Sequence, residues 1–203
     1  MKFLTIHICL FAGLLTLASC GDSNTEQVQD SKVAEEKAPE PKSVFPFYKD
    51  IEIRPGLNFE VVSWGKGADS VGGFLILMSD TLKNRYRSFS DERETVITDA
   101  WNLDLDTDGD PEIYVQVRGD HNVADLNVYE YSNGSFNKIR FPGLSSSLKK
   151  QHAGNDRFMI KAGDLFRTFS VKNPDDTTGK AAGTKTMQYR LRGNTFSTAE
   201  VEQ

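Results

Sequence analysis

Cysteine is scarce in this sequence, and its two cysteines, Cys9 and Cys20, both lie near the N-terminus of the 203-residue chain. The residues that follow therefore offer no disulfide, thiol nucleophile or cysteine-based metal site. Positive charge is also in deficit. The formal net charge of −5 disfavours a nucleic-acid partner and favours a cationic one.

Histidine and the short motifs of common enzymes are sparse or missing as well. The sequence has no G-x-S-x-G, no H-E-x-x-H, no phosphate-binding P-loop and no dinucleotide-binding fingerprint. Beyond residue 20 only His121 and His152 remain, both among polar residues that are typical of exposed loops. We therefore expect that the protein is not an enzyme.

The N-terminal segment predicts export. Residues 1–19 contain one basic residue, Lys2, and an apolar run that is short for a membrane span, as in a secretory signal peptide. The small residues before Cys20 resemble a bacterial lipobox, which implies cleavage before Cys20 and lipidation of its thiol. We expect a protein anchored by lipid in the bacterial cell envelope, at the outer membrane, facing the periplasm or the surface.

The chain then divides into a tether and a domain. Residues 20–43 contain no aromatic residue and are rich in charge and proline, so they bury too little apolar surface to fold. Residues 44–203 have the length of one ordinary domain. Their composition does not settle the oligomeric state, and a dimer is compatible with it.

The apolar periodicity of this domain is that of β-strands. Alternating stretches meet at turn residues in three places, namely Asn133-Gly134, Ala162-Gly163-Asp164 and Gly193-Asn194. The stretches "NFEVVSWG" and "GGFLILMSD" add two further strands, and no segment shows a helical stripe of three turns. The pattern predicts an all-β fold, a single antiparallel barrel or sandwich.

The stretch "LDLDTDGDPEIYVQV" places acidic residues at alternate positions before a strand. The spacing matches the first nine positions of known calcium loops, but Val115 stands where an EF-hand has its bidentate Glu, and a strand follows instead of a helix. Three interpretations stay open: a calcium site, a catalytic carboxylate cluster, and an Asp-Gly turn without a ligand. The candidate calcium ligands are Asp104, Asp106, Asp108, Asp110 and Glu112.

Several blocks in order resemble the periplasmic inhibitors of invertebrate-type lysozyme. They are "LDTDGDPEIYVQV", "LNVYEYSNGSFNKIRF", "AGNDRFMIKAGDLFRTFSV" and "GTKTMQYRLRGNTF", and the likeness covers about residues 96 to 198. The resemblance implies an antiparallel barrel or sandwich of about eight strands. It also implies inhibition by a loop that enters the active-site cleft of a lysozyme.

The sequence departs from this family in the inhibitory loop itself. Where those inhibitors carry a Ser-Gly-x-Tyr-type loop, this chain reads "RGDHNVADLNVY". The candidate partner-binding residues in this place are Arg118, Asp120, His121, Asn122 and Asp125. Two functions therefore stay open: an anchored inhibitor of a lysozyme or other cell-wall hydrolase, and a calcium-stabilised, non-enzymatic module that binds an envelope glycan or protein.

Overall fold

The computed structural model describes residues 45–65, 72–93, 95–172 and 181–202, all within one compact unit that spans residues 41–203. The predicted signal peptide, Cys20 and the tether lie outside the described residues. The described residues form twelve strands, a short α-helix and a 3₁₀ turn. The elements are β1 (Phe47–Arg54), β2 (Leu57–Trp64), β3 (Gly72–Asp80), β4 (Arg85–Arg93), β5 (Val96–Leu103), β6 (Glu112–Arg118), η1 (Asp120–Asn122), β7 (Ala124–Ser132), β8 (Ser135–Ile139), α1 (Ser146–Gln151), β9 (Arg157–Lys161), β10 (Asp164–Lys172), β11 (Ala181–Arg192) and β12 (Thr195–Val201).

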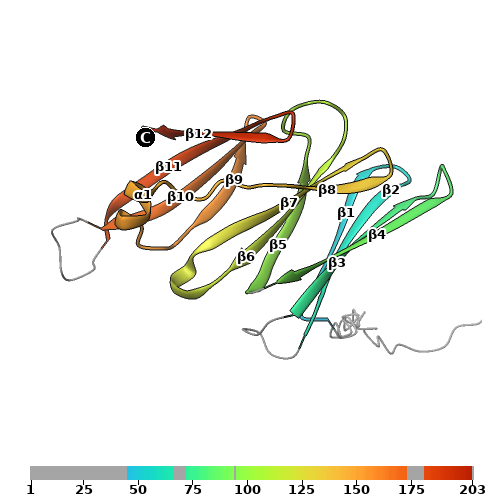
Figure 1. Ribbon diagram of the computed structural model, residues 1–203, viewed down its shortest axis with the longest axis horizontal. Helices are drawn as coiled ribbons and strands as arrows, with labels where there is room; N and C mark the ends of the chain where they lie inside the picture. The colour runs from blue at the N-terminus through green and yellow to red at the C-terminus, as the bar shows by residue number, and fades with distance from the viewer. Residues whose placement is uncertain (1–44, 66–71, 94, 173–180, 203) are drawn as a thin grey trace, which may run out of the picture. The chain divides into compact units, whose positions relative to one another are not determined.

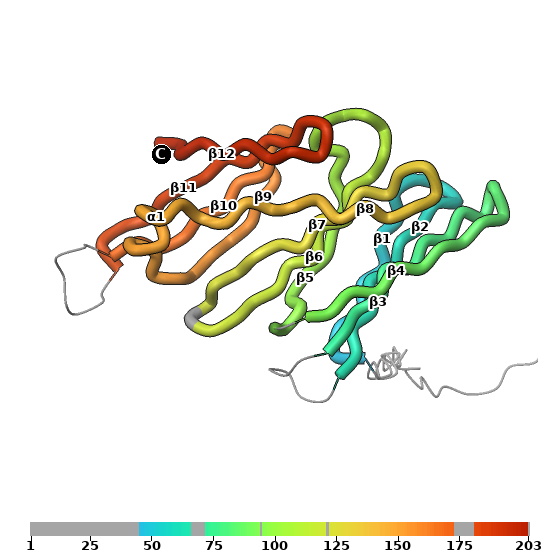
Figure 2. The backbone as a smooth tube through the Cα atoms, in the orientation of Figure 1, coloured from blue at the N-terminus to red at the C-terminus, as the bar shows by residue number. Residues whose placement is uncertain are grey.

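The strands form three antiparallel sheets, each built from four consecutive strands. The first sheet has the order β1-β2-β3-β4, the central sheet β5-β6-β7-β8 and the third β12-β11-β10-β9. Figures 1 and 2 show the three meanders following one another along the chain. Each sheet is open at both edges, so of the two predicted architectures the sandwich fits and the barrel does not.

The all-β prediction is confirmed, but the described residues form twelve strands instead of about eight. β1 and β4 are the clearest reason, because most of their side chains are exposed and polar. β4 shows little apolar alternation in its sequence, and Lys49 interrupts the alternation of β1.

The predicted hairpin turns are present in the structure. Asn133-Gly134, Ala162-Gly163 and Gly193-Asn194 join β7 to β8, β9 to β10 and β11 to β12, and all six residues have positive φ. Two consecutive residues of positive φ match the right-handed twist of the paired strands. Apolar alternation together with the turn residues was therefore enough to locate these hairpins.

The central sheet is buried on both faces, and β6 shows why its sequence is almost continuously apolar. Ile113 and Val115 belong to a hydrophobic core shared with the first sheet, whereas Tyr114 belongs to a second core shared with the third sheet. Successive side chains of a strand point to opposite faces. The domain is thus a stack of three sheets with two cores.

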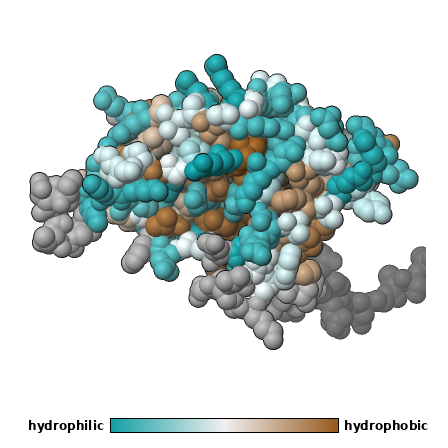
Figure 3. All heavy atoms as spheres, viewed as in Figure 1, coloured by the Kyte–Doolittle hydropathy of each residue, from teal (hydrophilic) through white to brown (hydrophobic). Residues whose placement is uncertain are grey.

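The short helix closes one end of the second core. The Ser145 hydroxyl accepts a hydrogen bond from the Leu148 amide at 3.3 Å and so caps α1, and Leu148 is buried. No helix among the described residues has the length and apolar character to cross a membrane. On the face drawn in Figure 3, hydrophilic side chains predominate, with hydrophobic ones visible between them.

Candidate functional site

The acidic loop connects β5 to β6, and it brings four carboxylates together. The ligand atoms of these side chains all lie within 4.8 Å of one another. The four residues are Asp104, Asp106, Asp108 and Glu112. The fifth predicted ligand, Asp110, is not a member of this cluster, and its amide donates a hydrogen bond to Asp108 at 2.9 Å.

The backbone of the loop curls around its own carboxylates. Thr107 and Gly109 both have positive φ, 62° and 90°. The amide of Gly109 donates to Oδ2 of Asp104 at 3.2 Å. Gly109 tolerates positive φ, and the Asp side chains accept hydrogen bonds from nearby amides, so the same sequence that supplies the acids also folds them inward.

Glu112 is the unusual member, because it is fully buried. Its Oε2 accepts hydrogen bonds from the Leu105 amide at 2.8 Å and the Tyr114 hydroxyl at 3.5 Å. Its Oε1 is closed to solvent and has no hydrogen-bond partner. A buried carboxylate oxygen without a donor is costly, and a cation would satisfy it.

Asp106 repeats this arrangement. Its Oδ2 accepts a hydrogen bond from the Gly193 amide at 3.1 Å, and its Oδ1 is buried without a partner. Gly193 belongs to the turn between β11 and β12, in the third sheet. The cluster therefore stands where the central sheet meets the third sheet.

The electrostatics of the cluster favour a cation. Burial, and to a smaller extent the three aspartates of the cluster, raise the pKa of Glu112 to about 8. Glu130 lies opposite Glu112 in the β6–β7 register, and burial and the nearby aspartates also raise its pKa. Because oxygen-only ligands suit hard cations, the cluster can hold a metal ion.

The predicted partner-binding residues gather at one turn. Arg118 ends β6, while Asp120, His121 and Asn122 form η1, so the chain reverses before β7. The Gly119 amide donates to the Val123 carbonyl at 2.9 Å. Asp120, Asn122 and, on β7, Asp125 are exposed.

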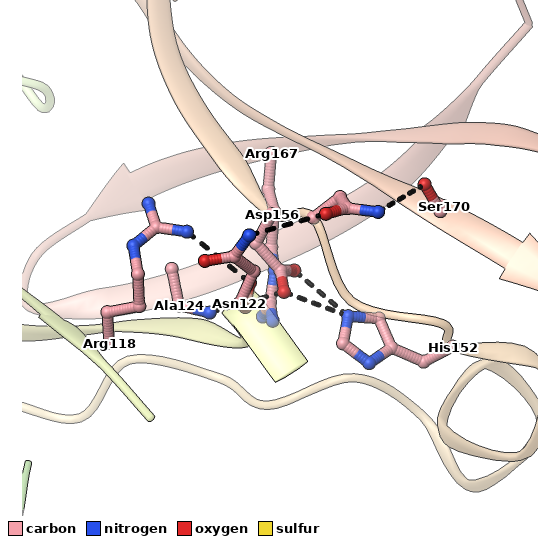
Figure 4. A network of polar contacts seen from close by, with 8 residues as sticks. Arg118, Asn122, Ala124, His152, Asp156, Arg167 and Ser170 are labelled. Carbon is pink, nitrogen blue, oxygen red and sulfur yellow. Dashed lines mark hydrogen bonds and ion pairs between the residues drawn. The ribbon is translucent and has the colours of Figure 1, made fainter. Parts of the chain in front are cut away.

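A buried carboxylate that directly precedes β9 holds this turn in place, as Figure 4 shows. Asp156 accepts hydrogen bonds from the Arg167 guanidinium at 2.7 Å and the Ala124 amide at 3.2 Å. Its own amide donates to the Asn122 carbonyl at 3.2 Å, and His152 Nε2 lies 3.0 Å from its carboxylate. His152, Asp156 and Arg167 thus form one network that braces the turn at η1, and the sequence pattern did not reveal it.

Beside this turn lies a pocket of about 620 Å³. The charged side chains that line it are Asp91, Glu92, Arg93, Asp120, Asp125 and Lys138. Four carboxylates against two cationic groups leave an excess of two negative charges, so the pocket favours a cationic partner.

Comparison of this chain with protein-family models, with curated proteins and with solved structures finds no match. The resemblance to lysozyme inhibitors therefore stays a prediction from the sequence.

Proposed function

We propose that this chain is a calcium-stabilised, non-enzymatic binding module of the bacterial cell envelope, whose partner is an envelope glycan or protein. The observation that carries the proposal is the pair of buried, unpartnered carboxylate oxygens on Asp106 and Glu112, inside a cluster of four acids. Calcium takes six to eight oxygen ligands and tolerates irregular geometry. Four carboxylates with loop carbonyls suit this ion better than a smaller, strictly octahedral one.

A binding role suits the cluster better than catalysis. Glu112, the carboxylate with the most strongly raised pKa, is closed to solvent, so a substrate would not reach it. The predicted lipid anchor and tether would present the domain in the envelope. We assign the ion a structural role, which is to fasten the loop between β5 and β6 to the turn at Gly193.

The experiment is a thermal unfolding series on residues 41–203, in EGTA, in magnesium and in millimolar calcium. With calcium at about 100 times its Kd, we expect the melting temperature to rise by about 5–10 °C. Glu112→Gln should remove this rise, and Asp110→Asn, outside the cluster, should keep it. A melting temperature that is the same in EGTA and in calcium would reject the proposal.

A second candidate function is inhibition of a lysozyme or another cell-wall hydrolase. The acidic pocket beside η1 supports it, because lysozymes are typically cationic and opposite charges accelerate association. The buried bracing by Asp156 supports it as well, since a rigid loop loses little entropy when it enters a cleft.

Inhibition is tested in a cell-wall clearing assay with invertebrate-, chicken- and goose-type lysozymes. We expect inhibition of one type, weaker at high salt. Substitutions His121→Ala and Asn122→Ala should weaken it, whereas Leu82→Ala, on the distant turn between β3 and β4, should not. If all three lysozymes clear the cell walls fully in the presence of the protein, inhibition is rejected and the module has another partner.

A further inference from the structure

An exposed tryptophan of the first sheet, Trp64, packs against two glycines of the neighbouring strand. Trp64, Gly73 and Glu92 are direct partners across β2, β3 and β4. Direct partners point to the same face, and Phe74, the next residue after Gly73, is fully buried on the other face. Trp64 and Glu92 therefore flank Gly73 on the face that points away from the core.

Gly73 leaves room for the indole ring. A Cβ atom added there would lie 2.4 Å from Cζ2 and 2.9 Å from Cε2 of Trp64. The ring thus rests on the backbone of Gly73, and yet Trp64 remains 41% exposed. Glycine inside a strand weakens the strand and often marks the close approach of another group.

Gly72 fixes the backbone of the same tryptophan. A Cβ atom there would lie 2.4 Å from the Trp64 carbonyl oxygen and 3.1 Å from Nη2 of Arg93. The buried guanidinium of Arg93 donates to that carbonyl at 3.4 Å and to the Thr95 carbonyl at 3.2 Å. Gly73 thus lies against the indole ring, Gly72 and Arg93 hold the Trp64 backbone, and the ring stays partly exposed to solvent.

Polar groups surround the ring. A pocket of about 540 Å³ is lined by Trp64, the two glycines, Ser90, Asp91 and Glu92. The Asp91 carboxylate already binds the Tyr129 hydroxyl at 2.6 Å and Lys138 at 2.7 Å. The exposed side chains of Ser90 and Glu92 remain to meet a ligand.

A second aromatic ring stands on the same face. Tyr48 on β1 pairs with Val62, two residues before Trp64 on β2, so the two aromatic residues are diagonal neighbours. Tyr48 is 48% exposed, and its hydroxyl donates to Glu60 at 2.5 Å, which fixes the ring. The face therefore offers two oriented aromatic rings among hydroxyl and carboxylate groups.

We propose that this surface, centred on Trp64, binds a polysaccharide, with a pyranose ring on the indole and sugar hydroxyls bound by Ser90 and Glu92. The C–H groups on one side of a pyranose are weakly positive and suit the negative face of an aromatic ring. Because Lys138 already neutralises Asp91, the Glu92 carboxylate is the charged group of this pocket that remains to accept hydrogen bonds from sugar hydroxyls. The inference rests on the proposed binding function and names its ligand class.

The experiment measures co-sedimentation of residues 41–203 with insoluble peptidoglycan sacculi, chitin and cellulose, with calcium present. We expect at least one polysaccharide to retain the protein, and the three arms distinguish the source of the sugar. Trp64→Ala should reduce the retained fraction at least tenfold. Trp64→Phe, which keeps an aromatic ring, should reduce the retained fraction by a smaller factor. Met159→Ala, a control with similar exposure (43%) on β9 of the third sheet, should leave it unchanged.

Two outcomes would overturn the inference: no retention by any of the three polysaccharides, or equal retention of the Trp64→Ala variant. Far-UV circular dichroism of each variant shows whether it is folded. The calcium melting series is independent of this assay. A calcium response without retention would leave the calcium-stabilised module intact and remove only the glycan, and a protein partner at Trp64 would then be the alternative.

Discussion

Glu112 places a carboxylate where water does not reach, and this makes the calcium-free protein sensitive to pH. Its pKa is about 8 in the folded state, against an ordinary value of 4.5. Between these values the folded protein keeps a proton that the unfolded chain releases, so the free energy of unfolding falls as the pH rises. The contribution of the Glu112 proton to the free energy of unfolding is complete below about pH 4.5 and is lost above about pH 8.

We therefore expect the melting temperature in EGTA to fall from about pH 5 to about pH 8. In saturating calcium the fall should shrink, because the ion binds the ionised carboxylate and replaces the proton. Glu112→Gln removes the titrating group, and its melting temperature should depend less on pH than that of the wild type. Parallel curves for the two proteins would contradict the assignment to Glu112.

The residues of the metal cluster were only partly predictable. Alternate spacing in one loop pointed to Asp104, Asp106, Asp108 and Glu112, since all four lie within nine positions of the sequence. Glu130 and Gly193 were missed, because a strand register and a turn of another sheet bring them to the loop. Sequence spacing detects ligands within one loop but not those supplied by tertiary contacts.

At the scale of elements, the position of η1 depends on a buried ion pair in the third sheet. Asp156 and Arg167 are both almost fully buried and lie 2.7 Å apart. Asp156→Asn would leave the guanidinium without its counter-charge, and removing one partner of a buried pair costs about 3–5 kcal/mol. We expect a loss of this size in urea unfolding, with faster hydrogen exchange at the Ala124 amide.

The double variant Asp156→Asn with Arg167→Met provides the control. It leaves no unpaired charge, so part of the lost stability should return. The exchange rate at Ala124 should stay high, because the charged acceptor of its amide is still missing. A double variant that is as unstable as the sum of the single ones would show that the two side chains act independently.

Elements differ in how well the sequence predicted them. The hairpins with Asn-Gly or Gly-Asn turns were predictable from the sequence, because those residues adopt positive φ readily. β1 and β4 could not be predicted in this way, since Lys49 interrupts the apolar alternation of β1 and most residues of β4 are polar. The stack of three sheets was not predicted, because the apolar run of β6 does not show which partner covers each face.

At the scale of the whole molecule, the shared central sheet should make unfolding cooperative. Trp64 reports on the first sheet and Trp101 on the central sheet, where it stacks on Tyr114 at 5.9 Å. Variants with a single tryptophan, Trp64→Phe and Trp101→Phe, should give urea transitions that coincide with each other and with circular dichroism. Separate midpoints would mean that the sheets unfold as independent units.

The order of the strands has a consequence for how the chain is assembled. Every ladder joins strands that are neighbours in the sequence, so each sheet forms from one continuous segment of the chain. A chain that leaves the ribosome N-terminus first can complete its first two meanders before residues 157–201 are made. Until then Tyr114, Leu126 and Val128 face water. A stalled or truncated chain therefore exposes an aggregation-prone apolar surface of the kind that chaperones bind.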